Sequence, residues 1–87
     1  LLNMSNEFIV YPNPSRGELN CLLYSEEKSS AEISLFDITG KQVYVRKMYL
    51  EEGRNILRIT PNVGTGVYFL KINSEQINYG VSKILFQ

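Results

Sequence analysis

Apolar and polar residues alternate along seven short segments of this chain, and this period of two constrains the fold more than any other feature. In the segment 18–24, for example, Leu19, Cys21 and Leu23 share one face. The segments are rich in β-branched and aromatic residues, and none of them has a helical period. The predicted strands span residues 7–11, 18–24, 31–37, 41–49, 55–60, 66–73 and 79–86. Strands this short and this regularly spaced predict an all-β fold, an antiparallel sandwich.

The same alternation predicts which side chains face the interior. We expect the core to contain Leu19, Cys21, Leu23, Ile33, Leu35, Val43, Val45, Leu57, Ile59, Tyr68, Leu70 and Ile72. In the fourth predicted strand this places Val43 and Val45 inside, and Tyr44 and Arg46 outside. Because Lys47 has the parity of the two valines, we expect a bulge or the end of the sheet near it.

Glycine marks two of the turns between predicted strands. "DITGK" (37–41) joins the third strand to the fourth, and "EEGRN" (51–55) joins the fourth to the fifth. Gly40 and Gly53 can take the positive φ that a short hairpin loop requires. We therefore expect both connections to be tight turns.

The segment "YPNPSRG", residues 11–17, carries two of the three prolines of the chain and lies between two predicted strands. Proline has no N–H and biases the residue before it toward extended geometry, so Tyr11 and Asn13 are expected to be extended. Asn13 and Gly17 suit the turn that follows. The segment is predicted to end the first strand and to blunt a sheet edge, which is a sufficient structural role.

A second notable segment, "NVGTGVYFLKI", places a tyrosine at the start of the sixth predicted strand. In immunoglobulin-like sandwiches, a tyrosine at this kind of position hydrogen-bonds back to the backbone across a corner. We expect Tyr68 to have that role, with a ligand-stacking tyrosine as the functional alternative.

Length and charge limit the classes of function. The chain has 87 residues, which fits one domain, and no apolar run approaches the roughly 18 residues that span a bilayer. Its nine basic and nine acidic residues sum to zero charge, which disfavours nucleic acid as a partner. The bases are concentrated after Gly40, where there are seven of them and three acids. This leaves open a solvated surface that sums to zero or a basic docking face on the C-terminal half.

The residue types of catalytic and metal sites are scarce. Cys21 is the single cysteine, its spacing predicts a buried thiol, and the chain has no histidine. Thiol catalysis and zinc binding therefore have little support, and an enzyme would have to rely on paired carboxylates. Most of the acids lie in predicted turns, where carboxylates are solvated. We expect no catalytic residue, no metal and no cofactor.

Four segments, taken together in this order and spacing, resemble a known family. They are "VYPNPSRGELN", "ISLFDITGKQV", "GVYFLKI" and the final "VSKILFQ". The set is similar to the type A C-terminal sorting domains of proteins exported by the type IX (Por) secretion system of Bacteroidetes. The resemblance covers residues 8–87, with Cys21 as a departure where an ordinary apolar residue is typical.

The resemblance implies a fold and a role. Such domains are seven-stranded immunoglobulin-like sandwiches at the end of a larger exported protein, so residues 1–7 are expected to end a linker from an upstream cargo domain. They are not enzymes. The outer-membrane translocon reads them in the periplasm, and a sortase-like peptidase commonly removes them in the linker before the first strand. The cargo is then joined to an anionic lipopolysaccharide at the cell surface or released outside the cell.

The resemblance also implies which residues form the family motif. They are Pro12, Asn13, Pro14, Gly17, Asp37, Gly40, Gly66, Tyr68 and Lys83. We further expect the last strand to present an open edge near Lys83, to which a strand of the translocon could add.

The alternative function is that of an accessory sandwich module, adhesive or carbohydrate-binding, on an exported enzyme. A planar row of exposed aromatic side chains would favour it. Tyr44, Tyr49 and Tyr79 are the candidates for such a row, and we expect them to be scattered or half-buried.

Overall fold

Seven antiparallel strands form within residues 7–87, the part of the chain that the computed structural model describes. They coincide closely with the alternating segments of the sequence. The strands are β1 (Phe8–Tyr11), β2 (Leu19–Ser25), β3 (Ser29–Phe36), β4 (Gln42–Leu50), β5 (Gly53–Ile59), β6 (Gly66–Ser74) and β7 (Asn78–Phe86). The expected linker end at residues 1–7 lies, apart from Glu7, outside the described residues.

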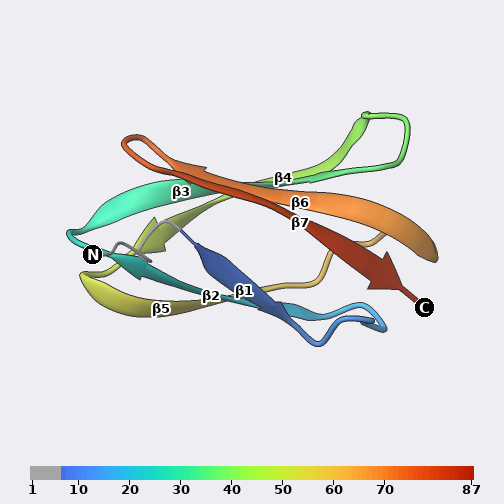
Figure 1. The fold of residues 1–87 in the computed structure, drawn as a ribbon, viewed down its shortest axis with the longest axis horizontal. Coiled ribbons are helices and arrows are strands. Elements are labelled where there is room, and N and C mark those ends of the chain that lie inside the picture. Colours follow the sequence, from blue (N-terminus) through green and yellow to red (C-terminus); the bar gives the residue numbers. More distant parts are fainter. Residues whose placement is uncertain (1–6) are drawn as a thin grey trace.

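The strands form two sheets packed face to face, as Figure 1 shows from the side. One sheet has the order β1-β2-β5 and the other the order β4-β3-β6-β7. The fourth strand pairs with the third, whereas in a constant-type immunoglobulin domain it joins the other sheet. The predicted all-β immunoglobulin-like sandwich is confirmed.

The core lies between the two sheets and is formed by the side chains that the strands point inward. Nine residues of the predicted core are buried: Leu19, Cys21, Leu23, Ile33, Leu35, Leu57, Ile59, Leu70 and Ile72. Tyr68 and Val43 are half-buried and pack against this cluster. Five further buried residues complete it: Ala31, Leu50, Tyr79, Ile84 and Phe86. Each fully buried Leu or Ile contributes about 1.5–3 kcal/mol.

The predicted facing of β4 is wrong. Val45 is 48% exposed, whereas Tyr44 and Met48 pack against the core. The reason is a bulge at the start of the strand rather than near Lys47: Phe36 pairs with Gln42 and Leu35 with Tyr44, so Val43 is the extra residue. An extra residue reverses the inside–outside parity of everything after it.

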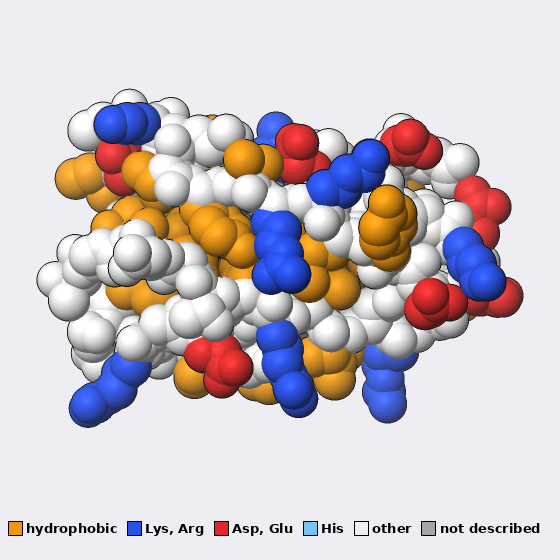
Figure 2. Space-filling view, turned by 180° about the vertical axis from the view of Figure 1, so that it is seen from behind, with side chains coloured by type: hydrophobic (Ala, Val, Ile, Leu, Met, Phe, Trp, Pro, Cys, Tyr) orange, Lys and Arg blue, Asp and Glu red, His pale blue; other side chains and the backbone are white. Residues whose placement is uncertain are grey.

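Arg46 shares the inward parity of Tyr44 and yet is exposed. β4 is an edge strand, so a long side chain can lay its apolar stem along the core and keep its charge in water. Viewed from behind, apolar side chains are visible between the two layers, and Lys or Arg side chains lie over them (Figure 2).

Tyr79 links the two sheets. It is the extra residue of an irregularity in β7, between the pairs Ile72–Gly80 and Asn73–Asn78. Its ring is buried, and its hydroxyl donates a hydrogen bond of 2.8 Å to the carbonyl of Tyr24 in β2. A buried tyrosine hydroxyl needs such a partner, and here the partner belongs to the opposite sheet.

Both predicted glycine turns have the expected backbone. Gly40 has φ +89° and Gly53 has φ +99°, in the region that favours glycine. The second turn is closed by the buried side chain of Asn55, which accepts from the N–H of Glu51 and donates to its carbonyl, both at 2.9 Å.

Candidate functional site

The residues of the predicted motif gather at one end of the sandwich. They lie on the β1–β2 and β3–β4 connections, on the first part of β6 and on the last part of β7, which all reach the same end of this antiparallel fold (right in Figure 1). We call this the motif end and define it as residues 12–18, 37–41, 60–68 and 83–87. β1 runs toward this end, and its first residue, Phe8, lies four residues before Pro12.

The "YPNPSRG" segment docks on the edge of β7. Asn13 spans two residues of that strand: its Nδ2 donates to the carbonyl of Lys83 at 2.8 Å, and its Oδ1 accepts from the N–H of Leu85 at 3.0 Å. Ser15 continues the pairing with its backbone, which donates to the carbonyl of Leu85 and accepts from the N–H of Gln87, both at 2.8 Å. The segment therefore extends the four-stranded sheet by a short parallel bridge.

Ser15 fixes the turn from this bridge into β2. Its side chain is buried, donates to the carbonyl of Glu18 at 2.6 Å and accepts from the N–H of Gly17 at 3.0 Å. Gly17 has φ +143°, which only glycine adopts readily, and this explains why glycine suits the position. Pro12 and Pro14 are exposed on either side of Asn13, and both X–Pro peptide bonds are cis.

The proline segment therefore blunts a sheet edge, as the sequence predicted, and the edge that it covers is that of β7. The segment covers the edge of β7, over residues 83–87, where the sequence favoured an open edge near Lys83. The expectation of strand addition at this place is therefore wrong: the outward N–H and C=O groups of Leu85 already have partners within the domain.

Tyr68 forms the corner predicted for it. Its hydroxyl donates to the carbonyl of Gly64, four residues earlier, at 3.0 Å. Its ring meets the ring of Phe86 edge to face, with centroids 5.5 Å apart. Gly66, which lies between Gly64 and Tyr68 in the sequence, has φ +140°, so a residue with a side chain would be strained at this position. The motif residues Gly66 and Tyr68 thus hold the start of β6 against the end of β7.

Asp37 organises the β3–β4 turn. Its Oδ1 accepts three hydrogen bonds, from the Thr39 hydroxyl at 2.6 Å, the Thr39 N–H at 2.9 Å and the Lys41 N–H at 3.0 Å. These bonds favour the charged carboxylate, and the Thr39 hydroxyl and the Lys41 N–H are the main causes that lower the pKa of Asp37 below 3.8. The carboxylate is occupied in holding the turn.

Lys83 contributes its backbone to the motif end, and its side chain forms no hydrogen bond with another residue of the described range 7–87. Its backbone carbonyl accepts the Asn13 bond, while its side chain is exposed on the outer face of β7, opposite Phe69 of β6. Lys83 is thus the charged motif residue whose side chain is open to solvent, as the Pro12 and Pro14 rings also are.

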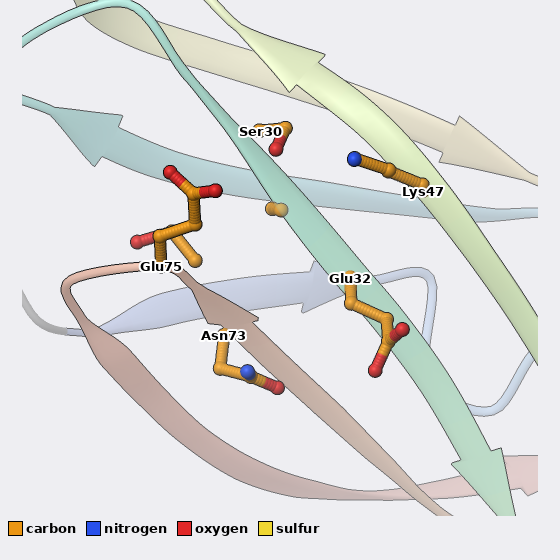
Figure 3. Close-up of a pocket in the computed structure, with 7 residues that line it drawn as sticks. Ser30, Glu32, Lys47, Asn73 and Glu75 are labelled. Carbon is orange, nitrogen blue, oxygen red and sulfur yellow. The ribbon is translucent and has the colours of Figure 1, made fainter.

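One hollow on the outer face of this sheet lies away from the motif end. It is open, about 220 Å³ in volume, and Ser30, Glu32, Lys47, Asn73 and Glu75 contribute to its lining. Figure 3 shows the Glu75 and Lys47 side chains on either side of Ser30. Within residues 7–87, no three His, Cys, Asp or Glu side chains are close enough together to hold a metal ion.

The buried thiol is inert. Cys21 is fully buried in the core, and burial raises the pKa of its thiol to about 12. The reactive form of cysteine is the thiolate, so this side chain serves packing.

The aromatic row that an accessory binding module would need is not formed. Tyr44 packs against the core, Tyr79 is buried and bonded to Tyr24, and Tyr49 alone of the three is fully exposed, at 80%. The three rings are scattered, as expected. No described helix is long and apolar enough to span a membrane.

Sequence reasoning missed Ser15 and the pairing of its segment with β7. The pairing joins residues about seventy positions apart, such as Asn13 and Leu85. No local pattern predicts a contact of that separation. The one available signal is a short polar side chain two residues before a glycine, which is typical of a side chain that closes a turn.

Comparison with known families gives a match over nearly the whole chain. The profile of a family described as "Secretion system C-terminal sorting domain" matches residues 9–87. A search of curated proteins found no match. The matched range contains the proline segment, the Asp37 turn, the tyrosine corner and Lys83. The chain therefore belongs to the type IX secretion system C-terminal sorting domains, the signals that direct an attached cargo across the outer membrane.

Proposed function

We propose that the type IX translocon of the outer membrane reads this domain directly, as a folded address, after the cargo has reached the periplasm. The observation that carries the proposal is the family match over residues 9–87. In this proposal the domain performs no chemistry of its own. Its carboxylates and its thiol support turns and packing, as Asp37 and Cys21 do.

The arrangement of the two ends supports the proposal. β1 runs toward the motif end, so a cargo joined before Phe8 approaches from the side away from that end and leaves it accessible. An address that serves a bulky cargo has to remain accessible while that cargo is attached.

We also propose that a sortase-like peptidase removes the domain in the chain before β1, within or ahead of residues 1–7. A protease needs an extended substrate, and a cut before β1 leaves every strand of the sandwich intact, whereas a cut within a strand requires unfolding. The cargo then stays at the surface, joined to an anionic lipopolysaccharide, or is released.

The test is a fusion. A periplasmic reporter with its own N-terminal signal is fused ahead of these residues and produced in type IX-competent cells and in cells that lack the translocon. We expect the reporter at the surface or in the medium of competent cells only, and shorter by the mass of the domain. A folded fusion that stays in the periplasm of competent cells would contradict the address, and export at full length would contradict the cleavage alone.

A further inference from the structure

The outer face of the four-stranded sheet is unusually apolar near the motif end. Directly opposite residues of an antiparallel sheet share a face, so the strand register gives rows of side chains across it. The first row joins Val67 and Leu85, and the second joins Phe36, Phe69 and Lys83. The third joins Val45, Ser34, Lys71 and Val81.

Large apolar side chains of these rows are open to solvent. Val81 is 60% exposed, Val45 48%, Phe69 37% and Leu85 36%. On a sheet with one solvated face, that face is normally polar in alternation with the core face. We call the six residues Val45, Phe69, Lys71, Val81, Lys83 and Leu85 the lysine face.

The charge of this face has one sign. Its two charged residues, Lys71 and Lys83, stand among apolar neighbours. In the next row Glu32 faces Lys47 across the pair β3–β4, and Glu75 of the β6–β7 connection lines an open hollow together with Lys71, whereas Lys83 lies at the far side of the face. The Asp37 carboxylate at the adjacent turn stays charged and is held in that turn by three hydrogen bonds to its Oδ1. On the face itself, an approaching surface meets two positive charges among apolar side chains.

Over residues 83–87 the edge of β7 is covered, so this stretch can meet a partner only through its side chains. Asn13 and Ser15 occupy the outward backbone groups of Leu85 and the carbonyl of Lys83, so a partner strand cannot add there without displacing the proline segment. The Lys83 and Leu85 side chains project from the same stretch onto the open face. The segment that closes the edge thus also fixes the strand that presents the face.

We propose that the lysine face docks on a translocon protein that presents an apolar patch bordered by Asp or Glu side chains. Charge complementarity argues for an acidic partner, and apolar contacts closed off from water strengthen such ion pairs. The proposal rests on the proposed function, because it names the surface through which the address is read. It gives the motif residue Lys83 a role in binding and leaves the other motif residues a role in folding.

The test reverses the charge of the face. Lys71→Glu with Lys83→Glu is compared with Arg54→Glu with Arg58→Glu, which makes the same change of charge on the outer face of the other sheet. Each pair is made in the reporter fusion, and the melting temperature of each purified domain is measured. Lys71→Gln with Lys83→Gln, which adds no new charge, covers the case in which reversal disturbs folding. We expect the face variants to melt like the parent and to lose export by about tenfold or more, while the arginine variants export normally.

Each other outcome is decisive. Normal export of folded lysine variants, or an equal loss in the arginine variants, overturns the proposal and leaves the address intact. Failure of the parent fusion to leave the periplasm overturns the proposed function and this surface with it. A parent domain that sediments as a dimer, with lysine variants that sediment as monomers, assigns the face to a second copy and overturns the translocon as its occupant.

Discussion

Asn13 lies between two prolines, neither of which has an N–H, and its side chain supplies the bonds that the local backbone lacks. Its single amide group donates to the carbonyl of Lys83 and accepts from the N–H of Leu85, as the backbone of a neighbouring strand would. Asparagine is suited to this because its amide offers a donor and an acceptor side by side. The position is thus explained by hydrogen bonding within the domain.

We expect Asn13→Ala to lower the free energy of unfolding by about 1–2 kcal/mol, because two hydrogen bonds of ordinary strength are lost. Urea denaturation followed by tyrosine fluorescence measures this. Asn62→Ala, at an exposed asparagine of the β5–β6 connection, is the control and should change little. An Asn13 variant as stable as the parent would contradict the clamp on β7.

The Asp37 turn predicts a dependence of stability on pH. A carboxyl group whose pKa is lower in the folded than in the unfolded chain adds stability above its unfolded pKa, and that stability is lost as the pH falls through the folded pKa. We therefore expect the parent to lose stability as the pH falls below about 4 and Asp37→Asn to lose less over the same interval. Urea midpoints measured at a series of pH values decide this; parallel curves would show that the carboxylate has no such role.

Single residues also set the limit of what the sequence predicts. The glycines at 40 and 53 and the corner tyrosine follow from local chemistry, and the structure agrees. Val45 does not: residues 43–45 are all apolar, so alternation alone cannot tell which of them faces the core once one extra residue enters the strand. The Asn13 clamp is a contact between distant parts of the chain, which periodicity does not encode.

At the scale of the elements, β7 has three roles. It pairs with β6, it carries the buried Ile84 and Phe86, and its edge receives the proline segment. The alternation of its sequence predicted the strand but not its outer partner. The last residues of the chain are therefore part of the core as well as of the proposed docking face.

This changes the expected effect of a truncation. Sequence alone favours a domain that keeps most of its sandwich without residues 83–87. In the structure the deletion removes Ile84 and Phe86, which are 0% and 4% exposed, and the bonds of Asn13 and Ser15. We expect a loss of about 4 kcal/mol or more, comparable with the whole stability of a small domain.

Thermal unfolding followed by circular dichroism checks this prediction. Removal of Gln87 alone, which is exposed and contributes one backbone bond to Ser15, is the matched control and should melt within a few degrees of the parent. A cooperative transition near the parent melting temperature in the 83–87 deletion would contradict the account of β7. Where it unfolds, a loss of export in that deletion reports on folding and not on recognition.

At the scale of the whole molecule, the two ends of the sandwich differ in charge and in use. Three connections at the end opposite the motif end carry the acids Glu26, Glu27, Glu51, Glu52 and Glu75 and one base, Lys28. Acidic side chains gather at that end in Figure 2, on the right in that view. The motif end and the lysine face lie away from it. A partner that is itself acidic is repelled by one end and attracted by the opposite part of the molecule, which orients its approach.

The central claim is that the motif residues other than Lys83 act by building the fold and that the lysine face, which includes Lys83, is what the translocon contacts. The most direct test is the export of each fusion plotted against the folded fraction of its domain, measured by protease resistance in the periplasm. The parent and a core variant, Leu70→Ala, define how export falls as the folded fraction falls. We expect Asn13→Ala and Tyr68→Ala to follow this relation. We expect Lys71→Glu with Lys83→Glu to be exported far less than its folded fraction predicts. A well-folded Asn13 or Tyr68 variant that is not exported, or a lysine variant that follows the relation, would contradict the account.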